Sequence, residues 1–492
     1  MSYLLAISIG PVQDFIAAAR RTADLFAGSE ILAKITKNVA ETLETHIKTH
    51  GGQLIFPNTS KEGGANKILA EVSSDPKELV ESIKTKARDF LLEEWQTAFS
   101  SFSDKNAVHE PRAKVQVQDF LEIYAAWVEL GDYKESRTQV ERLLAGRKAL
   151  RDFQQPPQDD STIPKSPLDA SRASVLLNPS LLADAKTQGK PLRLKATEHL
   201  DAISLLKRIY GTRESDRVID TRTMARLALN EKAKPQDRAF EDEDSITEPQ
   251  PYYAILHADG DKMGALIETK NSAQEHREFS STLASFASGV EDIVKRHRGF
   301  KIYSGGDDVL AFLPVNTAIA CARELARDFA TKLPEASLSV GIAIVHYREP
   351  LSISLDYARA AEKAAKNKAA PKLEQGNRLA VALHTRGGAP MTVVEPWNKP
   401  ELEKLLELYQ SERKISRGVP YELRELAREW EKTRLSMSVL EAEAARIAAR
   451  KEGVTLEIPT LESIKDLETF ANKLVLARFL SGLGGENADQ NS

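Results

Sequence analysis

Apolar residues in the first part of the chain follow two different periods. Short runs of large aliphatic and β-branched residues, each ended by glycine or proline, are typical of buried strands. Longer stretches repeat apolar residues every three or four positions, as amphipathic helices do. The elements predicted here are, in chain order, a strand at Leu4–Ile9, a helix at about Val12–Thr49, a strand at Gln53–Phe56, a last strand at Asp119–Leu130 and a charged helix at Tyr133–Phe153.

The middle of the chain repeats this order of elements. The elements predicted there are a strand at Tyr252–His257, a turn at Asp259-Gly260-Asp261, a helix at about Ala273–His297, strands at Phe300–Tyr303 and Val309–Leu313, a helix at Thr317–Leu333, a strand at Leu338–Val345, a helix at Ser354–Lys368 and a last strand at Arg378–Leu383. Both stretches begin with strand, turn, long helix and strand, which indicates an internal duplication. The order β-α-β-β-α-β is that of a ferredoxin-like or palm fold.

The remaining stretches complete an α+β prediction. They are interpreted as a linker at Gln154–Pro167, a helix at Ala196–Tyr210, a polar stretch at Glu231–Gln250, three helical patterns at Glu401–Arg413, Tyr421–Glu452 and Leu461–Leu480, and a disordered tail from Ser481. We expect two ferredoxin-like palm domains at 1–155 and 246–392, a helical domain at 156–245 between them, and a C-terminal helical bundle with its tail at 393–492.

Composition excludes several classes of protein. The net charge of −4 gives no basic field over the whole chain, so any RNA contact must be local or made inside an assembly. The single cysteine, Cys321, excludes a disulfide framework and a zinc site made of cysteines, and we expect it to be buried in a helix. No apolar run is long enough to cross a membrane, so a cytoplasmic protein is predicted.

Candidate chemistry lies in Ser304-Gly305-Gly306-Asp307-Asp308, between two short predicted strands. Two glycines allow a tight hairpin and leave room for a phosphate chain to approach the backbone. The adjacent carboxylates of Asp307 and Asp308 repel each other unless a cation neutralises them, and Mg²⁺ or Mn²⁺ prefers such oxygen ligands. The alternative interpretation is a plain structural turn, which Gly-Gly-Asp-Asp also suits.

A third carboxylate comes from Asp259, which follows the preceding predicted strand. In a βαββ arrangement that strand lies beside the hairpin, so Asp259 and Asp307 are expected to meet at one edge of the sheet. We interpret Asp259, Asp307 and Asp308 as metal ligands of a two-metal site for phosphoryl transfer, with Asp307 and Asp308 catalytic. Residues expected to bind the nucleotide are Gly260, Asp261, Lys262, Met263, Gly264, Ser304, Gly305, Gly306, Lys363 and Lys366. For the two lysines, a solvated helix face is the alternative.

These motifs resemble a known family. Leu256–Gly264 and Tyr303–Phe312 are similar to the palm domain of the CRISPR polymerase, the large subunit of type III CRISPR interference complexes, here of the Cmr type. Ser339–His346 and Ala365-Lys366 fit the same palm, and Ile7–Ile16 resembles the start of that family's first palm. The resemblance covers about residues 1–50 and 250–390, and elsewhere rests on the order of the elements.

The resemblance implies an activity, a substrate and partners. Family members use ATP to make cyclic oligoadenylates, a second messenger, when the complex binds target RNA, and some join AMP to another small molecule instead. Asp307, Asp308 and Asp259 match the family's catalytic and metal-binding aspartates, and Lys366 matches a phosphate-facing lysine. The implied partners are the other subunits of the complex and, through them, guide RNA and target RNA. The C-terminal bundle is the implied contact for a small helical subunit.

The chain departs from the family at three places. The first palm has Ile55-Phe56-Pro57-Asn58 where an acidic pair would stand, so it is expected to hold no catalytic metal, although a second ATP as acceptor is compatible with it. No histidine precedes an aspartate, so no HD nuclease is expected. Ser166-x-x-Asp169 and Asp201-x-x-Ser204 stand where relatives carry cysteine pairs, so no structural zinc is expected.

Two further functions compete with this one. A GGDEF-type cyclase making a guanine dinucleotide shares the palm and metal chemistry, but Asp308-Val309 stands where such enzymes carry Glu-Phe. A scaffold subunit without catalysis predicts no nucleotide turnover. Basic residues at Arg20-Arg21, and on one helix at Arg137, Arg142, Arg147, Lys148 and Arg151, are candidates for RNA phosphate contacts, with a solvated mixed-charge face as the alternative for that helix.

Overall fold

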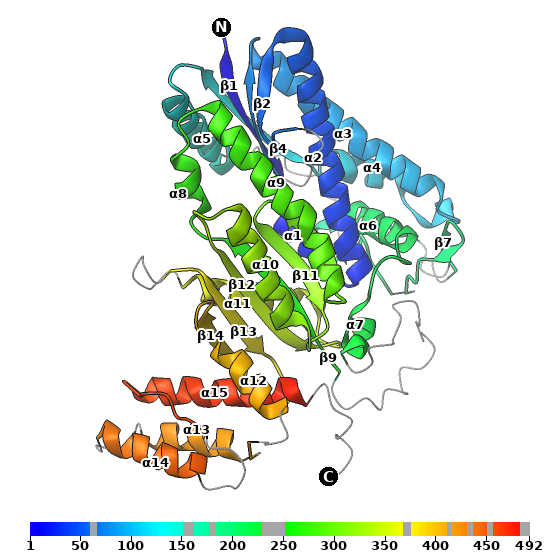
Figure 1. Cartoon of the computed structure of the whole chain (residues 1–492). Helices are drawn as coiled ribbons and strands as arrows, with labels where there is room; N and C mark the ends of the chain where they lie inside the picture. Colours follow the sequence, from blue (N-terminus) through cyan, green and yellow to red (C-terminus); the bar gives the residue numbers. More distant parts are fainter. Residues whose placement is uncertain are drawn as a thin grey trace.

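The computed structural model describes residues 1–59, 66–150, 162–177, 181, 184–195, 197–228, 251–367, 375–410, 415–416, 418–430, 432, 436–449 and 456–482. Parts of the predicted linker, the polar stretch at Glu231–Gln250 and most of the predicted tail lie outside these residues. The chain forms two β-sheets, with helices on their faces and a group of helices at the C-terminal end (Figure 1). This confirms the mixed α+β prediction.

The first unit is a four-stranded sheet in the order β2-β3-β1-β4. Its elements are β1 (Tyr3–Gly10), α1 (Gln13–Ala17), α2 (Thr22–His50), β2 (Gly52–Phe56), β3 (Lys67–Val72), α3 (Pro76–Ser100), a short 3₁₀ helix (Lys105–Ala107), α4 (Glu110–Gln118), β4 (Glu122–Glu129) and α5 (Tyr133–Ala149). All neighbouring strands in this sheet are antiparallel. The unit therefore has the β-α-β-β-α-β order of a palm.

Two sequence predictions for this unit need correction. The single helix predicted at about Val12–Thr49 is two helices, because the chain leaves helical geometry between α1 and α2. The strand predicted at Asp119–Leu130 is shorter, because α4 ends at Gln118 and the chain turns before β4. β3, α3 and α4 were not predicted, although Pro76 and the Asp75 cap mark the start of α3 in the sequence.

A small region of short elements follows the first unit. It contains β5 (Lys165–Ser166), β6 (Asp169–Ala173), β7 (Lys186–Thr187), β8 (Lys190–Pro191), α6 (Ala202–Arg213) and α7 (Thr221–Leu227). α6 packs against α2, where Gly211 lies so close that an added Cβ would be 2.4 Å from the carbonyl oxygen of Ala23. A buried Arg208 guanidinium there contacts the carboxylates of Asp24 and Glu198. This network joins the middle region to the first unit.

The second unit repeats the first in the order of its strands. Its elements are β9 (Tyr252–Gly260), α8 (Met263–Glu268), α9 (Ala273–Arg296), β10 (Phe300–Gly305), β11 (Asp308–Leu313), α10 (Ala318–Lys332), β12 (Leu338–His346), α11 (Leu351–Lys366), β13 (Arg378–Leu383) and β14 (Met391–Pro396). The sheet order is β10-β11-β9-β12-β13-β14, and its first four strands occupy the places of β2, β3, β1 and β4. This equivalence supports the predicted duplication.

The prediction for the second unit missed α8 and placed its last strand one element too early. β14 pairs antiparallel with β13 and ends at Pro396, so the sheet continues past residue 392. α11 connects β12 to β13 as a crossover, and these two strands are parallel. Cys321 is fully buried in α10, as predicted. The domain limits drawn from the sequence remain predictions.

The two units pack against each other reciprocally. α9 of the second unit lies against β2 of the first, and α2 of the first unit lies against β10 of the second (Figure 1). Arg277 on α9 donates to Asn58 at 2.9 Å and to Gln53 at 2.8 Å. On the other side, the rings of Phe26 and Phe300 lie 5.4 Å apart. Each outer strand is therefore covered by a helix from the other unit.

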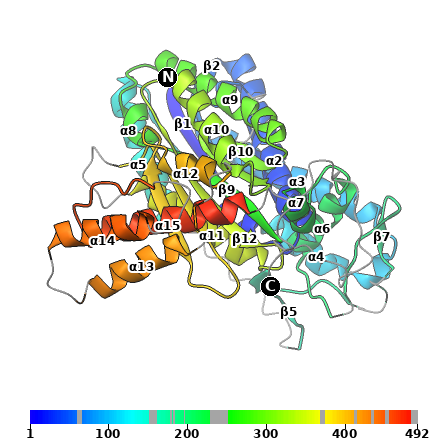
Figure 2. The same cartoon turned by 60° about the horizontal axis from the view of Figure 1, so that its bottom comes forward.

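The C-terminal helices lie against the end of the second sheet (Figure 2). They are α12 (Glu401–Gln410), α13 (Val419–Trp430), α14 (Met437–Ala449) and α15 (Ile464–Ser481). The long pattern predicted at Tyr421–Glu452 is thus two helices, and residues 431 and 433–435 between them lie outside the described part of the chain. In the described residues, no helix is long and apolar enough to span a membrane.

Candidate active site

The Gly-Gly-Asp-Asp segment forms the tip of the β10–β11 hairpin. Gly305 pairs with Asp308, so Gly306 and Asp307 are the two residues of the turn. Gly306 has a φ of +76°, which glycine adopts without the steric cost paid by other residues. The turn places the carboxylates of Asp307 and Asp308 next to each other at the end of the sheet.

Asp259 lies at the same end of the sheet. β9 is the neighbour of β11, with Ala258 paired to Val309, so the next residues along the two strands bring Asp259 close to Asp308. The backbone of Gly260 also lies close to the hairpin, because an added Cβ would be 2.6 Å from Asp307 Oδ2. The structure thus brings the three aspartates together, although Asp259 and Asp307 are 48 residues apart in the sequence. This agrees with the predicted meeting of Asp259 and Asp307 at one edge of the sheet.

The electrostatics of this cluster favour a cation. Burial, with the charges of Asp259 and Asp308 adding to it, raises the pKa of Asp307 to about 7. Burial and the charge of Asp259 likewise raise the pKa of Asp308 to about 6, although a hydrogen bond from Tyr303 opposes the shift. Oδ1 of Asp308 and Oγ of Ser304 are buried and have no hydrogen-bond partner among the described residues. Two partly buried carboxylates and oxygen atoms without hydrogen bonds are a suitable environment for a hard cation.

Lys366 supplies a positive charge at this site. It ends α11, and its ammonium group contacts the carboxylate of Asp259 and donates to the carbonyl oxygen of Gly260 at 3.2 Å. Glu362, one turn earlier, lies 3.5 Å away. Burial lowers the pKa of Lys366, but the bond to Asp259 and the charges around it raise the pKa overall. The other predicted lysine, Lys363, is exposed, which agrees better with the alternative of a solvated helix face.

A divalent ion fits the residues present, with one rearrangement. Within the part of the chain that the structure describes, no group of three or more acidic, histidine or cysteine side chains is arranged as a ready metal site. At this site, Lys366 contacts one of the two carboxylate oxygens of Asp259, which an ion could otherwise use. The donors are nevertheless all carboxylate oxygens, and the raised pKa values of Asp307 and Asp308 reflect charge that an ion would neutralise.

Asp261 has a different environment from Asp259. Its carboxylate accepts hydrogen bonds from Ser337 Oγ, Ser339 Oγ and the backbone N–H of Asn377, each at 2.7 Å. The side chain is buried, so its oxygens are engaged inside the protein. The structure gives no support to the predicted contact between this side chain and a nucleotide. Lys262, at a φ of +56°, and the first residues of α8, Met263 and Gly264, follow on the surface.

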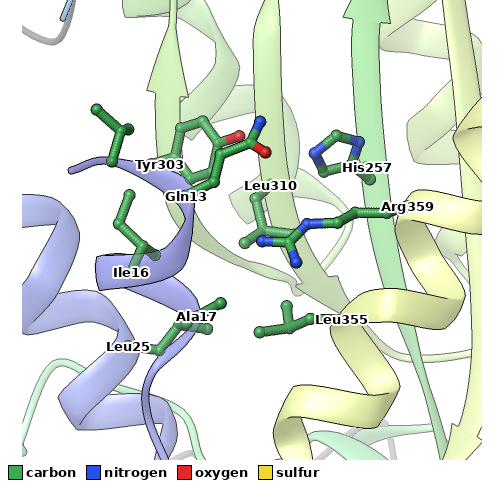
Figure 3. Close-up of a pocket in the computed structure, with 10 residues that line it drawn as sticks. Gln13, Ile16, Ala17, Leu25, His257, Tyr303, Leu310, Leu355 and Arg359 are labelled. Carbon is green, nitrogen blue, oxygen red and sulfur yellow. The ribbon is translucent and has the colours of Figure 1, made fainter. Parts of the chain in front are cut away.

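A narrow pocket lies beside the aspartates, between the second sheet and α1 (Figure 3). Gln13 points from α1 toward Tyr303, and Arg359 extends from α11 past His257 into the pocket (Figure 3). His257 is buried, and its Nε2 lies 3.5 Å from Asp308 Oδ1. The cavity has a volume of about 20 Å³, which suits one or two water molecules and is too small for a nucleotide base.

Sequence reasoning missed three residues near the aspartates. His257 is two positions before Asp259 in β9, and residues two apart in a strand point to the same face. Arg359 is two helical turns before Lys366 in α11 and therefore lies on the same side of that helix. Tyr303 contributes a hydrogen bond to Asp308. These periodicities, applied to the predicted ligands, are the signals that point to His257 and Arg359.

Two other sets of residues singled out in the sequence have structural roles. Asp201 caps α6 by accepting from the backbone N–H groups of Ile203 and Ser204, and Ser166 pairs with Asp169 in the β5–β6 turn. In the candidate RNA-binding cluster, Arg137 is only 1% exposed and donates to backbone carbonyl groups. It is therefore unavailable to RNA. Arg142 and Lys148 are exposed, and Arg151 lies outside the described residues.

Comparison with protein families decides the relationship. The family model for the N-terminal part of CRISPR-associated protein Cmr2 matches residues 4–130, and the model for the second palm domain of Cas10/Cmr2 matches residues 252–373. Together they cover about half of the chain. The chain belongs to the Cas10/Cmr2 family. The second match contains every residue of the candidate site of this Cas10/Cmr2 chain, from Asp259 to Lys366.

Individual relatives agree with this assignment. The CRISPR system Cmr subunit Cmr2 of Pyrococcus furiosus is 33% identical over 200 residues, which is 33% of this chain and 22% of that protein. The match thus spans about a fifth of the length of that relative. Among solved structures, a type III-B Cmr-beta complex bound to cognate target RNA has a similar chain, with a TM-score of 0.67 and 15% identity over 98% of this chain and 83% of the other.

A second structural relative comes from a Csm1-Csm4 cassette in complex with cA4. It matches with a TM-score of 0.55 and 12% identity, and the match covers 98% of this chain and 70% of the other. At this level of identity the likeness concerns the fold. The shared fold of these Cas10/Cmr2 and Csm1-Csm4 proteins extends over nearly the whole chain, including the helices at its C-terminal end.

Proposed function

We propose that this chain is the nucleotidyltransferase subunit of a type III CRISPR effector complex. In this proposal it joins ATP molecules into a cyclic oligoadenylate when the complex, carrying guide RNA, binds target RNA. The supporting observation is the meeting of Asp259, Asp307, Asp308 and Lys366 at one end of the second sheet, in the segment that matches the Cas10/Cmr2 palm. The complexes of structural relatives with cognate target RNA and with cA4 are consistent with it.

The residues of the site suit transfer of an AMP unit to a hydroxyl group. Bound Mg²⁺ or Mn²⁺ would supply charge neutralisation and a lowered pKa for the attacking hydroxyl. Asp259, Asp307 and Asp308 would hold such ions through their carboxylates. Lys366, which those ions would release from Asp259, is then placed to bind phosphate oxygens of the triphosphate. Gly305 and Gly306 leave the hairpin backbone open to the phosphate chain.

The first unit has a different part in this proposal. The residues at the end of β2, Phe56-Pro57-Asn58, carry no carboxylate, and Asn58 accepts from Arg277 and donates to Ser280 of α9. This end therefore holds the second unit and contributes no metal ligand. An acceptor ATP beside α1 is compatible with the proposal only if the narrow pocket there widens, because its present space suits water alone.

The test uses the assembled complex with target RNA, Mn²⁺ and ATP, and identifies products by mass spectrometry. The wild-type complex is expected to make cyclic oligoadenylate, and the double variant Asp307→Ala, Asp308→Ala is expected to assemble without making product. Incubation with ATP and other metabolites detects the alternative product, AMP joined to a second small molecule. ATP left unchanged by an active preparation of the wild-type complex would contradict the catalytic proposal.

Two alternative functions have distinct outcomes in the same assay. A scaffold subunit gives an assembled complex with no turnover by either the wild type or the double variant. A GGDEF-type cyclase uses GTP alone and gives a guanine dinucleotide. ATP is the favoured substrate, because the matching family model is the Cas10/Cmr2 palm and because Asp308 is followed by Val309 where a GGDEF-type enzyme has Glu-Phe.

A further inference from the structure

Asp261 occupies a branching point of hydrogen bonds just beyond the catalytic end of β9. Its backbone N–H donates to the carbonyl oxygen of Ser337 at 2.8 Å, and its carboxylate accepts from Ser337 Oγ and Ser339 Oγ at the start of β12. Ser339 is paired with Asp259 in the β9–β12 ladder. The side chain of Asp261 thus fixes the strand that borders Asp259 on the side away from the hairpin.

The same carboxylate also holds the segment that follows α11. It accepts from the backbone N–H of Asn377 at 2.7 Å, and the N–H of the preceding residue, Gly376, donates to the carbonyl oxygen of Lys366 at 3.0 Å. Asp261 is therefore connected through two consecutive backbone groups to the residue that contacts Asp259. Residues 368–374 lie outside the described part of the chain. The connection described here uses only Gly376 and Asn377, which follow that segment.

Gly376 shows how closely the two segments approach. Its φ is +79°, and an added Cβ would lie 2.4 Å from Cγ of Asp261. No side chain fits there unless Asp261 moves. The carboxylate itself accepts three hydrogen bonds at 2.7 Å, two on Oδ2 and one on Oδ1, so most of its acceptor capacity is used inside the protein.

We infer that Asp261 is a positioning residue that sets the separation of Asp259 and Lys366. It holds the end of β9 against β12 and, through Asn377 and Gly376, holds the C-terminal end of α11 over β9. The inference rests on the proposed function for its catalytic consequence. In this inference Asp261 contacts neither nucleotide nor metal. It affects catalysis through the position of Lys366.

The kinetic test is a double-mutant cycle with Asp261→Asn and Lys366→Ala in the assembled complex. Asp261→Asn removes the negative charge that strengthens all three hydrogen bonds and replaces one acceptor oxygen by an NH₂ group, so kcat is expected to fall about tenfold or more while KM for ATP changes less than about threefold. If Asp261 acts through Lys366, adding Lys366→Ala to Asp261→Asn costs much less than Lys366→Ala costs alone. Ser339→Ala, which removes one donor, is expected to have an intermediate effect.

Thermal unfolding separates positioning from general loosening of the fold. Val393→Ala, at a buried position of β14 in the same sheet, provides a variant of lowered Tm that is expected to keep the wild-type kcat. Wild-type kcat in Asp261→Asn, or full additivity with Lys366→Ala, would overturn the inference. A large rise in KM with unchanged kcat would instead indicate that Asp261 touches the nucleotide, and would overturn it as well.

A second measurement does not depend on turnover. Amine-reactive labelling of the full chain, read by mass spectrometry, reports how well Lys366 is held against Asp259. Asp261→Asn is expected to increase labelling of Lys366 about threefold or more, with exposed Lys363 unchanged as the internal control. Unchanged labelling of Lys366 contradicts the inference even when the wild-type complex is inactive. An inactive wild type with increased labelling would contradict the proposed function and leave the positioning role of Asp261 standing.

Discussion

The ammonium group of Lys366 contacts the carboxylate of Asp259, although the two residues are 107 positions apart in the sequence. Helix α11 carries this lysine back to the end of β9, where it neutralises one of three clustered carboxylates. An ion that binds the same oxygen of Asp259 would displace this contact. In the proposed function, the ammonium group of Lys366 then lies beside the site, where it can bind the triphosphate.

Replacing Lys366 should therefore affect catalysis far more than replacing its neighbour. Lys366→Ala is expected to lower kcat/KM for ATP by about 100-fold, because the proposed phosphate partner, a partly buried cation, is lost. Lys363→Ala is the matched control, since Lys363 is exposed on the same helix, and it is expected to stay within about twofold of the wild type. Initial rates with the assembled complex measure both. Equal losses in the two variants would show that charge on the helix matters and position does not.

Asp307 is expected to destabilise the chain when no divalent ion is bound. Its pKa in the folded chain, about 7, is above the ordinary value of 3.8, because burial and Asp259 disfavour the charged form. The folded state then binds more protons than the unfolded state between about pH 4 and 7, so the free energy of unfolding falls as the pH rises through this range. Asp307→Asn should remove this loss and raise the free energy of unfolding by about 1–3 kcal/mol at pH 8.

Chemical denaturation with and without Mn²⁺ checks this prediction for Asp307. Without divalent ions the variant should be the more stable protein. With Mn²⁺ the wild type should gain stability and the variant should gain less, because a ligand bound to the folded state stabilises it by mass action. A wild-type protein that is more stable than the variant in the absence of Mn²⁺ would contradict the argument from burial.

His276 predicts a loss of stability at acid pH. It is buried on α9, and its Nδ1 forms a hydrogen bond with the hydroxyl group of Tyr133 on α5 at 2.8 Å. Burial, together with the charge of Arg137, lowers its pKa from 6.5 to about 4. Between pH 6.5 and 4, His276 is protonated in the unfolded state and neutral in the folded state. The free energy of unfolding should therefore fall by up to about 2 kcal/mol as the pH decreases from 6.5 to 4.

His276→Gln isolates this contribution. The glutamine oxygen can still accept from Tyr133, but the side chain does not titrate, so the decrease between pH 6.5 and 4 should become shallower. His50→Gln serves as the control, because His50 is exposed at the end of α2 and should leave the decrease unchanged. Urea unfolding at several pH values measures the slope. An identical slope in wild type and His276→Gln would remove His276 from the explanation.

Arg137 links the first unit to α8 of the second. Its guanidinium donates to the carbonyl oxygens of Ile267 at 2.6 Å and Lys270 at 3.1 Å, at the C-terminal end of α8. Arg137→Ala should cost about 2–4 kcal/mol of unfolding free energy, because two carbonyl groups lose a charged donor and a buried side chain is removed. Arg142→Ala, an exposed change on the same helix, should cost less than about 0.5 kcal/mol. Denaturant midpoints for the two variants test the difference.

Much of the second unit could be predicted from local pattern. Its strands are short apolar runs ended by glycine or proline, and its long helices have clear apolar faces, so β9, α9, β10, β11, α10 and β12 were all expected. β14 was missed because Met391–Pro396 is partly exposed at the edge of the sheet and lacks the apolar run of a central strand. The break before α2 was missed because no glycine or proline lies between Gln13 and Thr22.

For the candidate site, the sequence predicted only the contacts between residues on neighbouring strands. The meeting of Asp259 with the hairpin follows from the βαββ order, and the register of β9 with β11 agrees with it. The environment of Asp261 could not be predicted, because its partners are 76, 78 and 116 residues away in the sequence. The burial of Arg137 could not be predicted either, because it depends on the position of α5 against α8, which local charge does not reveal.

The reciprocal covering of β2 by α9 and of β10 by α2 has a consequence for how the two copies can diverge. If the proposed chemistry takes place in the second unit alone, the first unit needs no carboxylates, but it still needs the outer surface against which α9 packs. Substitutions in the first unit are then limited to those that preserve its packing against α9 of the second unit. A unit that carries out no reaction would then be retained because its surface supports the structure of the second unit.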